Sequence, residues 1–123
     1  MPKKLEGRRA VMAEFAEAAA KRGEHFFYIR IQEPLNPKAR ASKYEDTLKD
    51  ALGELGRVTG GGSQLNEGNT IEYCGIDVVV ADRHHGLKLI RKIMKSCGAP
   101  AGTIIEEYLP LFREMLLKPK ANE

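Results

Sequence analysis

The most strand-like pattern of apolar and polar residues lies in the middle of the chain, over Gly56–Asp82. Its second half, Thr70–Ala81, is long and rich in β-branched residues, and its first half contains the glycine-rich Val58–Leu65; both patterns predict strands. Between them, Asn66–Asn69 has the residue types of a tight turn, including a glycine that accepts a positive φ. We therefore expect a central β-hairpin.

Apolar residues recur every three to four positions in three other segments, which predicts amphipathic helices. The predicted helices span residues 3–22, 42–55 and 82–97. Each is followed by a glycine, the residue that most often stands just after the last turn of a helix. Ser42 and Glu45 match a capping box at the start of the second helix, and Asp82 is the expected N-cap of the third.

Alternating apolar and polar residues predict two more strands. These are His25–Gln32 and Thr103–Tyr108. The segment Glu33–Ala41 contains two prolines and several basic residues, so we expect it to be an exposed basic loop. Near the end of the chain, Pro110–Leu117 is predicted to form a short amphipathic helix with Leu111, Met115 and Leu116 available to pack, and a polar tail follows it.

Without the first helix, the predicted order is β-α-β-β-α-β, which is the order of ferredoxin-like folds. We therefore expect an α+β fold with a four-stranded antiparallel sheet and two helices on one of its faces. The extra N-terminal and C-terminal helices would cover an edge or part of the open face. A chain of 123 residues suits one compact unit, divided into a helical extension (1–24), a ferredoxin-like domain (25–109) and a C-terminal helix and tail (110–123).

Cysteine content and hydropathy favour a cytoplasmic location. Cys74 and Cys97 lie in different predicted elements and form no CxxC motif, whereas a small secreted protein usually carries more cysteines at regular spacing. We also find no pattern of a signal peptide, and no stretch near the roughly 20 apolar residues of a membrane span. We therefore expect a cytoplasmic protein that does not contact a membrane and keeps both thiols free and buried.

The run Gly60-Gly61-Gly62-Ser63 allows two interpretations. Consecutive backbone N–H groups can form a nest that binds an anion. A phosphate-binding P-loop, however, requires a Lys-Ser/Thr pair and a helix directly after the glycines, and here the chain continues toward a turn. The alternatives are a bulged strand whose backbone a neighbouring element or a partner approaches closely, and a ligand site built from backbone amides.

Titratable side chains do not form a catalytic or metal-binding pattern. His84 and His85 are adjacent on a predicted helix, so they point about 100° apart and cannot chelate one metal together; His85 remains a candidate contact or pH-sensitive group. Glu106 and Glu107 are neighbours on a strand and face opposite ways. Asp77 is predicted to be a polar residue on the open face of the sheet, with a raised pKa if it is covered. We expect no catalytic residue, metal or cofactor.

The third predicted helix carries a basic stripe opposite its buried face. Its members are Lys88, Arg91, Lys92 and Lys95, spaced i, i+3, i+4 and i+7. Such a stripe is either an ordinary solvated helix face or a docking surface for an acidic protein or a nucleic acid. Tyr28 and Tyr73 occupy positions where RNA-binding ferredoxin-like domains stack bases, but the basic-aromatic-glycine motif of those domains is absent from Thr70–Val80.

Three runs carry a resemblance to a known group of proteins: GRVTGGGSQL, IEYCGIDVVVAD and CGAPAGTIIEEY. Together they resemble small single-domain bacterial ferredoxin-like proteins, some of which serve as immunity proteins beside secreted toxins. The resemblance covers roughly residues 25–108. It contains no catalytic motif and assigns no role to any residue.

We therefore predict a non-enzymatic, cytoplasmic protein-binding module of immunity-protein type that occludes a bacterial toxin domain with an acidic surface. Charge complementarity of this kind accelerates association. The predicted contacts are Tyr28, Arg30, Asp77, His84, His85, Lys88, Arg91, Lys92 and Lys95. The alternatives are a regulatory domain that binds a small ligand at Gly60–Ser63, an RNA-binding accessory protein, and an enzyme that uses His84, His85 or Asp77 around one cleft. Both a monomer and a homodimer fit the sequence.

Overall fold

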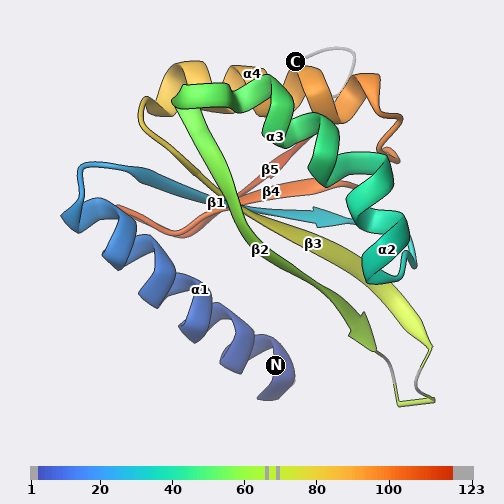
Figure 1. Ribbon diagram of the computed structural model, residues 1–123. Helices are drawn as coiled ribbons and strands as arrows, with labels where there is room; N and C mark the ends of the chain where they lie inside the picture. The colour runs from blue at the N-terminus through green and yellow to red at the C-terminus, as the bar shows by residue number, and fades with distance from the viewer. Residues whose placement is uncertain (1–2, 66, 69, 118–123) are drawn as a thin grey trace, which may run out of the picture.

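The computed structural model describes residues 3–65, 67–68 and 70–117 and has an α+β architecture (Figure 1). An antiparallel five-stranded sheet with the order β2-β3-β1-β4-β5 forms its centre. The strands are β1 (His25–Ile31), β2 (Gly56–Leu65), β3 (Ile71–Val80), β4 (Ile104–Glu107) and β5 (Arg113–Leu116). The helices are α1 (Lys3–Lys21), α2 (Pro37–Arg40), α3 (Asp46–Leu52) and α4 (Arg83–Ser96), with a π-helical segment (Ala41–Glu45) between α2 and α3 and a 3-10 turn (Gly53–Leu55) after α3.

The main core lies between the sheet and the helices α3 and α4. Alternate residues of β1 and β3 face it, as the sequence pattern predicts. They are Phe27, Ile29 and Ile31 from β1 and Ile76, Val78 and Val80 from β3, all fully buried. The helices contribute Leu48 and Leu52 from α3 and Ile90 and Met94 from α4. Burial of these aliphatic side chains is the main favourable contribution to folding.

Helix α1 covers part of the opposite face of the sheet, as expected for the N-terminal extension. Figure 1 shows α1 on one side of the sheet and α3 and α4 on the other. Met12, Ala16 and Ala19 of α1 form a second, smaller cluster with side chains from β1, β3 and the end of β4. Two of these three helix residues are alanines, so the helix backbone can lie close to the strands.

The predicted hairpin is confirmed as β2 and β3, paired from Gly56 opposite Val80 to Leu65 opposite Ile71. Its register shifts between Val58 and Gly60, which is the signature of a bulge next to the glycine run. The predicted turn includes positions 66 and 69, which lie outside the described residues.

The prediction of a loop over Glu33–Ala41 is wrong in its second half. Helix α2 begins at Pro37, where the Asn36 side chain accepts a hydrogen bond of 2.9 Å from the Ala39 amide. Proline suits the first turn of a helix because its missing N–H would have no helical partner there. The helical backbone then continues through Ala41–Glu45 into α3, so Ser42 lies inside the helical segment and does not cap it.

The prediction of a short helix over Pro110–Leu117 is also wrong. Residues 113–116 form strand β5, which pairs with β4 from Ile104 opposite Leu116 to Glu107 opposite Arg113. Met115 and Leu117 pack against the main core. Successive residues from 113 onward thus face opposite sides of the sheet, as strand geometry requires.

Candidate functional site

A surface of exposed apolar side chains lies where β4 leads into β5. Four of the eight large apolar side chains that are exposed in the described residues fall in this short segment, so exposure is concentrated there. They are Leu109, Leu111, Phe112 and Leu116, hereafter the 109–116 surface. Leu111 is 71% exposed. Contiguous exposed apolar groups of this kind mark interaction sites more often than isolated ones do.

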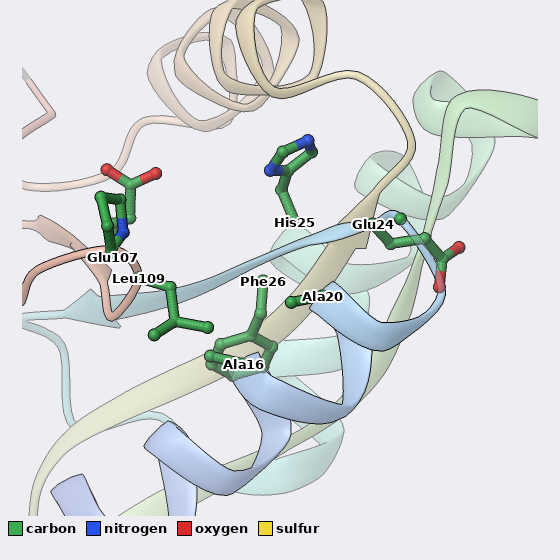
Figure 2. Close-up of a pocket in the computed structure, with 9 residues that line it drawn as sticks. Ala16, Ala20, Glu24, His25, Phe26, Glu107 and Leu109 are labelled. Carbon is green, nitrogen blue, oxygen red and sulfur yellow. The ribbon is translucent and has the colours of Figure 1, made fainter.

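A cavity of about 470 Å³ opens beside the 109–116 surface, between α1 and the segment that follows β4 (Figure 2). Its lining residues are Ala16, Ala20, Gly23, Glu24, His25, Phe26, Glu107, Leu109 and Pro110. Small residues on α1 leave the space open, and most of the lining is apolar. Its size falls within the usual range for pockets that bind ligands or partner side chains.

Aromatic rings fix the 109–116 surface to the rest of the fold. Phe15 of α1 lies 6.0 Å from Phe26 of β1, Phe26 lies 6.4 Å from Tyr108, and Tyr108 lies 5.0 Å from Phe112, measured between ring centroids. The guanidinium of Arg9 lies 4.5 Å from the centroid of the Phe112 ring. These contacts are in the range of favourable aromatic and cation–π pairs, so the surface is supported from both α1 and the sheet.

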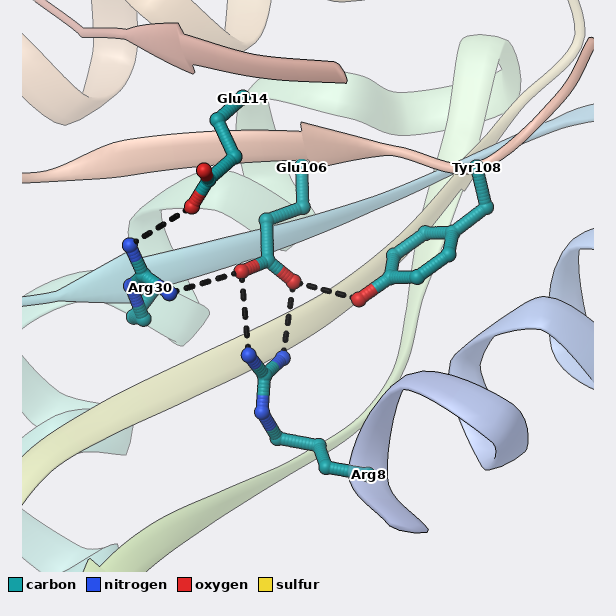
Figure 3. Close-up of polar contacts among 5 residues, drawn as sticks. All are labelled: Arg8, Arg30, Glu106, Tyr108 and Glu114. Atoms are coloured by element: carbon teal, nitrogen blue, oxygen red, sulfur yellow. Dashed lines mark hydrogen bonds and ion pairs between the residues drawn. The ribbon is translucent and has the colours of Figure 1, made fainter. Parts of the chain in front are cut away.

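Glu106 of β4 is fully buried and binds two arginines from different parts of the chain (Figure 3). Arg8 of α1 donates to both of its carboxylate oxygens at 2.8 and 3.1 Å, and Arg30 of β1 donates at 3.0 Å. The Tyr108 hydroxyl donates at 2.6 Å. Burial alone would raise the pKa of Glu106, but these hydrogen bonds outweigh it and the pKa is lowered. The network is therefore an ionised structural anchor for α1.

Glu107 faces the other side of the sheet, which confirms the predicted divergence of the two carboxylates. Arg83, in the first turn of α4, donates to it at 2.8 Å, and Arg113 of β5 lies 3.7 Å away. Each carboxylate therefore has its own arginines. The two do not form a pair for acid–base chemistry.

Three of the predicted contact residues belong to the face under α1. Tyr28 and Asp77 are register partners on β1 and β3 and are both buried. Arg30 binds Glu106 and also Glu114 at 3.0 Å. In this arrangement Tyr28 has almost no exposed surface on which a base could stack.

The other predicted contacts lie on α4, on the opposite side of the molecule. His84, His85, Lys88, Lys92 and Lys95 are exposed. Arg91 instead donates hydrogen bonds of 2.8 and 3.1 Å to the main-chain carbonyls of Leu116 and Leu117. The predicted residues therefore form two separate groups, and His84, His85 and Asp77 do not line the cavity beside the 109–116 surface.

The glycine run lies on the edge strand β2 and is closely approached by neighbouring elements. A Cβ at Gly60 would lie 3.1 Å from Asp77 Oδ2, and one at Gly61 would lie 2.8 Å from the Gly75 carbonyl oxygen. Ser63 donates to the Leu35 carbonyl at 2.6 Å. These contacts support the close-approach interpretation for Gly60 and Gly61, whereas a Cβ at Gly62 would meet nothing within 4 Å.

Asp77 lies on the predicted face, but it is buried rather than open. Only 8% of the residue is exposed, and its Oδ1 atom makes no hydrogen bond with any described residue. Burial raises the pKa of Asp77, and the nearby Arg40 guanidinium only partly opposes this. The carboxylate form therefore opposes folding at neutral pH.

We expect the substitution Asp77→Asn to stabilise the protein by about 1 kcal/mol at pH 7, because it removes a desolvated charge. Because the pKa of Asp77 is raised in the folded protein, protonation of this side chain favours folding. That stabilising contribution is fully present below the ordinary pKa of 3.8 and is lost as the pH rises through the raised value. The gain should therefore vanish below that ordinary value. Urea unfolding of both proteins across pH measures it, with the exposed Asp50→Asn as a control, and an equal gain at every pH would contradict the explanation.

Comparisons with known proteins give no relative. No protein family, no curated protein and no solved structure matches the chain. Within the described residues, no helix combines the length and apolar character that a membrane crossing needs, and no group of three or more metal-ligating side chains comes together.

The sequence did not reveal the 109–116 surface. Leu111 and Leu116 were predicted to pack in a helix, but they are exposed because the segment forms a turn and an edge strand. The run Leu109-Pro110-Leu111-Phe112 was the available signal, since three large apolar residues flank a helix-breaking proline there.

Proposed function

We propose that the protein is a non-enzymatic protein-binding module of immunity-protein type, and that its partner docks on the 109–116 surface. The observation that carries this proposal is the combination of strongly exposed Leu111 and partly exposed Phe112 with an adjacent apolar cavity. Protein interfaces concentrate their binding energy where large side chains meet well-formed pockets. A partner side chain in the cavity, with Leu111 and Phe112 against the partner, would make such a centre.

The fold supports a place among small ferredoxin-like proteins. The first four strands of the chain lie in the order β4-β1-β3-β2, and α3 and α4 cover the same face. In a β-α-β-β-α-β chain, this order lets each helix join two strands with one strand between them. Helix α1 and strand β5 are then additions to the domain, and the proposed docking surface lies between them.

Charge supports an acidic partner, such as a toxin domain encountered in the cytoplasm. The chain carries a net charge of +3, and Lys88, Lys92 and Lys95 are exposed along α4. The two buried acids of β4, Glu106 and Glu107, are in contrast paired with arginines inside the molecule. Exposed lysines on the same molecule as an apolar docking surface would speed association and favour acidic partners.

We expect Leu111→Asp to weaken partner binding at least about tenfold, because truncation or charging of a central apolar contact typically costs more than 1 kcal/mol. The partner is first purified with the tagged protein from its native cells and identified. Its affinity is then measured by calorimetry with purified components. Leu65→Asp is the matched control, since Leu65 is also exposed but lies at the end of β2. Equal affinities of wild type and Leu111→Asp would reject the surface, and the absence of any stoichiometric protein partner would reject the proposed function.

A further inference from the structure

Strand β5 is an edge of the sheet, since within the described residues it pairs only with β4. The Leu117 amide donates to the Thr103 carbonyl across the pair at 3.0 Å. Because backbone groups along an antiparallel pair point alternately toward and away from the partner strand, residues 113, 115 and 117 turn theirs toward β4. The backbone groups of residues 114 and 116 therefore point outward.

The two faces beside this edge differ in chemistry. On the face shared with α1, Phe112 and Leu116 present exposed apolar side chains on either side of Glu114, whose carboxylate is held by Arg30. On the other face, Arg91 reaches the carbonyls of Leu116 and Leu117 from α4. Lys88 and Lys95, one helical turn on either side of Arg91, are exposed along the same border. A strand placed next to β5 would thus meet apolar groups on one face and cations on the other.

The opposite edge of the sheet is less suited to accept a strand. Strand β2 contains register shifts between Val58 and Gly60 and between Gln64 and Leu65. Bulges of this kind twist an edge and disfavour the addition of further strands. The pairing of β5 with β4 is regular over its four residues.

We infer that β5 accepts an extended segment of the partner as an additional strand, and that apolar and acidic residues alternate in this segment. Main-chain hydrogen bonds to both backbone groups of Glu114 and to the Leu116 amide would supply affinity, whereas the Leu116 carbonyl already accepts from Arg91. The alternation follows from the pleat, because successive side chains of the added strand would face Phe112 and Leu116 on one side and Lys88 and Lys95 on the other. This inference rests on the proposed protein-binding function and specifies its mode.

The probes are two capped eight-residue peptides of equal length, one alternating valine with glutamate and one alternating valine with lysine. Titration of the isotope-labelled protein is followed by the NMR shifts of backbone amides. We expect the glutamate peptide to shift the amides of Glu114 and Leu116 and to bind at least about tenfold more tightly than the lysine peptide. Shifts that map to β2, or equal affinities for both peptides, would overturn the inference.

Variants separate the contributions of backbone and charge. Leu116→Pro removes one outward N–H, which an edge strand tolerates, and should abolish binding of the glutamate peptide. Lys88→Glu combined with Lys95→Glu should weaken that binding at least about tenfold and leaves the backbone of β5 intact. Lys21→Glu combined with Lys49→Glu changes net charge equally at exposed positions elsewhere and should have little effect. Retained binding by either of the first two proteins contradicts the inference, with a thermal melt of each confirming that it is folded.

The same proteins distinguish this inference from the proposed function. If the purified partner binds Leu116→Pro as tightly as wild type but binds Leu111→Asp weakly, strand addition is wrong and the proposed function stands. If the partner binds both variants as tightly as wild type, the 109–116 surface is rejected as well. A homodimer that Leu116→Pro dissociates would show that a second copy of the chain occupies β5, and would also overturn the inference.

Discussion

Replacement of Glu106 by leucine is expected to lower the free energy of unfolding by about 3–5 kcal/mol, the largest effect of any single substitution proposed for this protein. The side chains of Arg8 and Arg30 are only 11% and 16% exposed. Without the carboxylate, both guanidinium groups would stay largely buried without their main counter-ion. The Tyr108 hydroxyl would also lose its acceptor. Urea unfolding followed by circular dichroism measures the change.

The control for this prediction is Glu114→Gln, which removes the more exposed partner of Arg30. Ion pairs with a well-hydrated partner contribute little, so we expect a change below about 1 kcal/mol. Because the pKa of Glu106 is lowered in the folded protein, its stabilising contribution is present above its ordinary pKa of 4.5 and is lost as the pH falls through the lowered value. The difference between wild type and Glu106→Leu should therefore shrink in acid. A leucine variant as stable as Glu114→Gln at pH 7 would show that the network does not anchor α1.

The second large effect is expected at Gly75, where alanine should destabilise the protein by about 3 kcal/mol. A Cβ at this position would lie 2.0 Å from the Tyr28 hydroxyl oxygen and 2.5 Å from its ring atom Cε1. The ring of Tyr28 therefore lies directly over Gly75 and would have to move. Tyr28 is buried, and its ring centroid lies 4.9 Å from the guanidinium carbon of Arg8 on α1. Displacement of the ring would therefore also disturb the packing of α1 against the sheet.

A double-mutant cycle isolates the cause of this effect. In a Tyr28→Ala background, Gly75→Ala should cost little, because the atoms that clash are gone. Gly62→Ala is the control on the neighbouring strand, since a Cβ there meets nothing within 4 Å. Chemical unfolding of the four proteins of the cycle and the control provides the energies. If Gly75→Ala costs as much without the tyrosine as with it, close approach of Tyr28 is not the reason for the glycine.

Local patterns of apolar and polar residues predicted most strands of the sheet and most helices of the layer that covers its main core. The alternation in residues 25–32 and 70–81 and the periodicity in residues 82–97 each match an observed element, because burial against one face decides these segments. Residues 110–117 could not be predicted in this way. Their apolar positions suit a short helix as well as a strand, and only the pairing with β4 decides between the two. That pairing is a tertiary contact, which overrides local propensity.

The residues of the candidate site were predicted less well, for a related reason. The ion pair between Arg8 and Glu106 joins positions 98 residues apart, and no local spacing encodes it. Arg30 and Asp77 were expected to contact a partner, but in the folded chain Asp77 is buried and Arg30 is held by Glu106 and Glu114. In contrast, the exposure of Lys88, Lys92 and Lys95 follows directly from helical spacing opposite a buried stripe, and the structure confirms it.

The opposed carboxylates of β4 have a consequence for cooperativity. Glu106 connects the strand to α1, and Glu107, the next residue, connects it to α4 and to β5. Two successive residues therefore link the layers on both faces of the sheet. An opening motion that pulls β4 out of the sheet would release α1 and α4 together. We therefore expect the protein to unfold as one cooperative unit although its two apolar clusters lie on opposite faces. A force applied to strand β5 would be transmitted to α1 through strand β4.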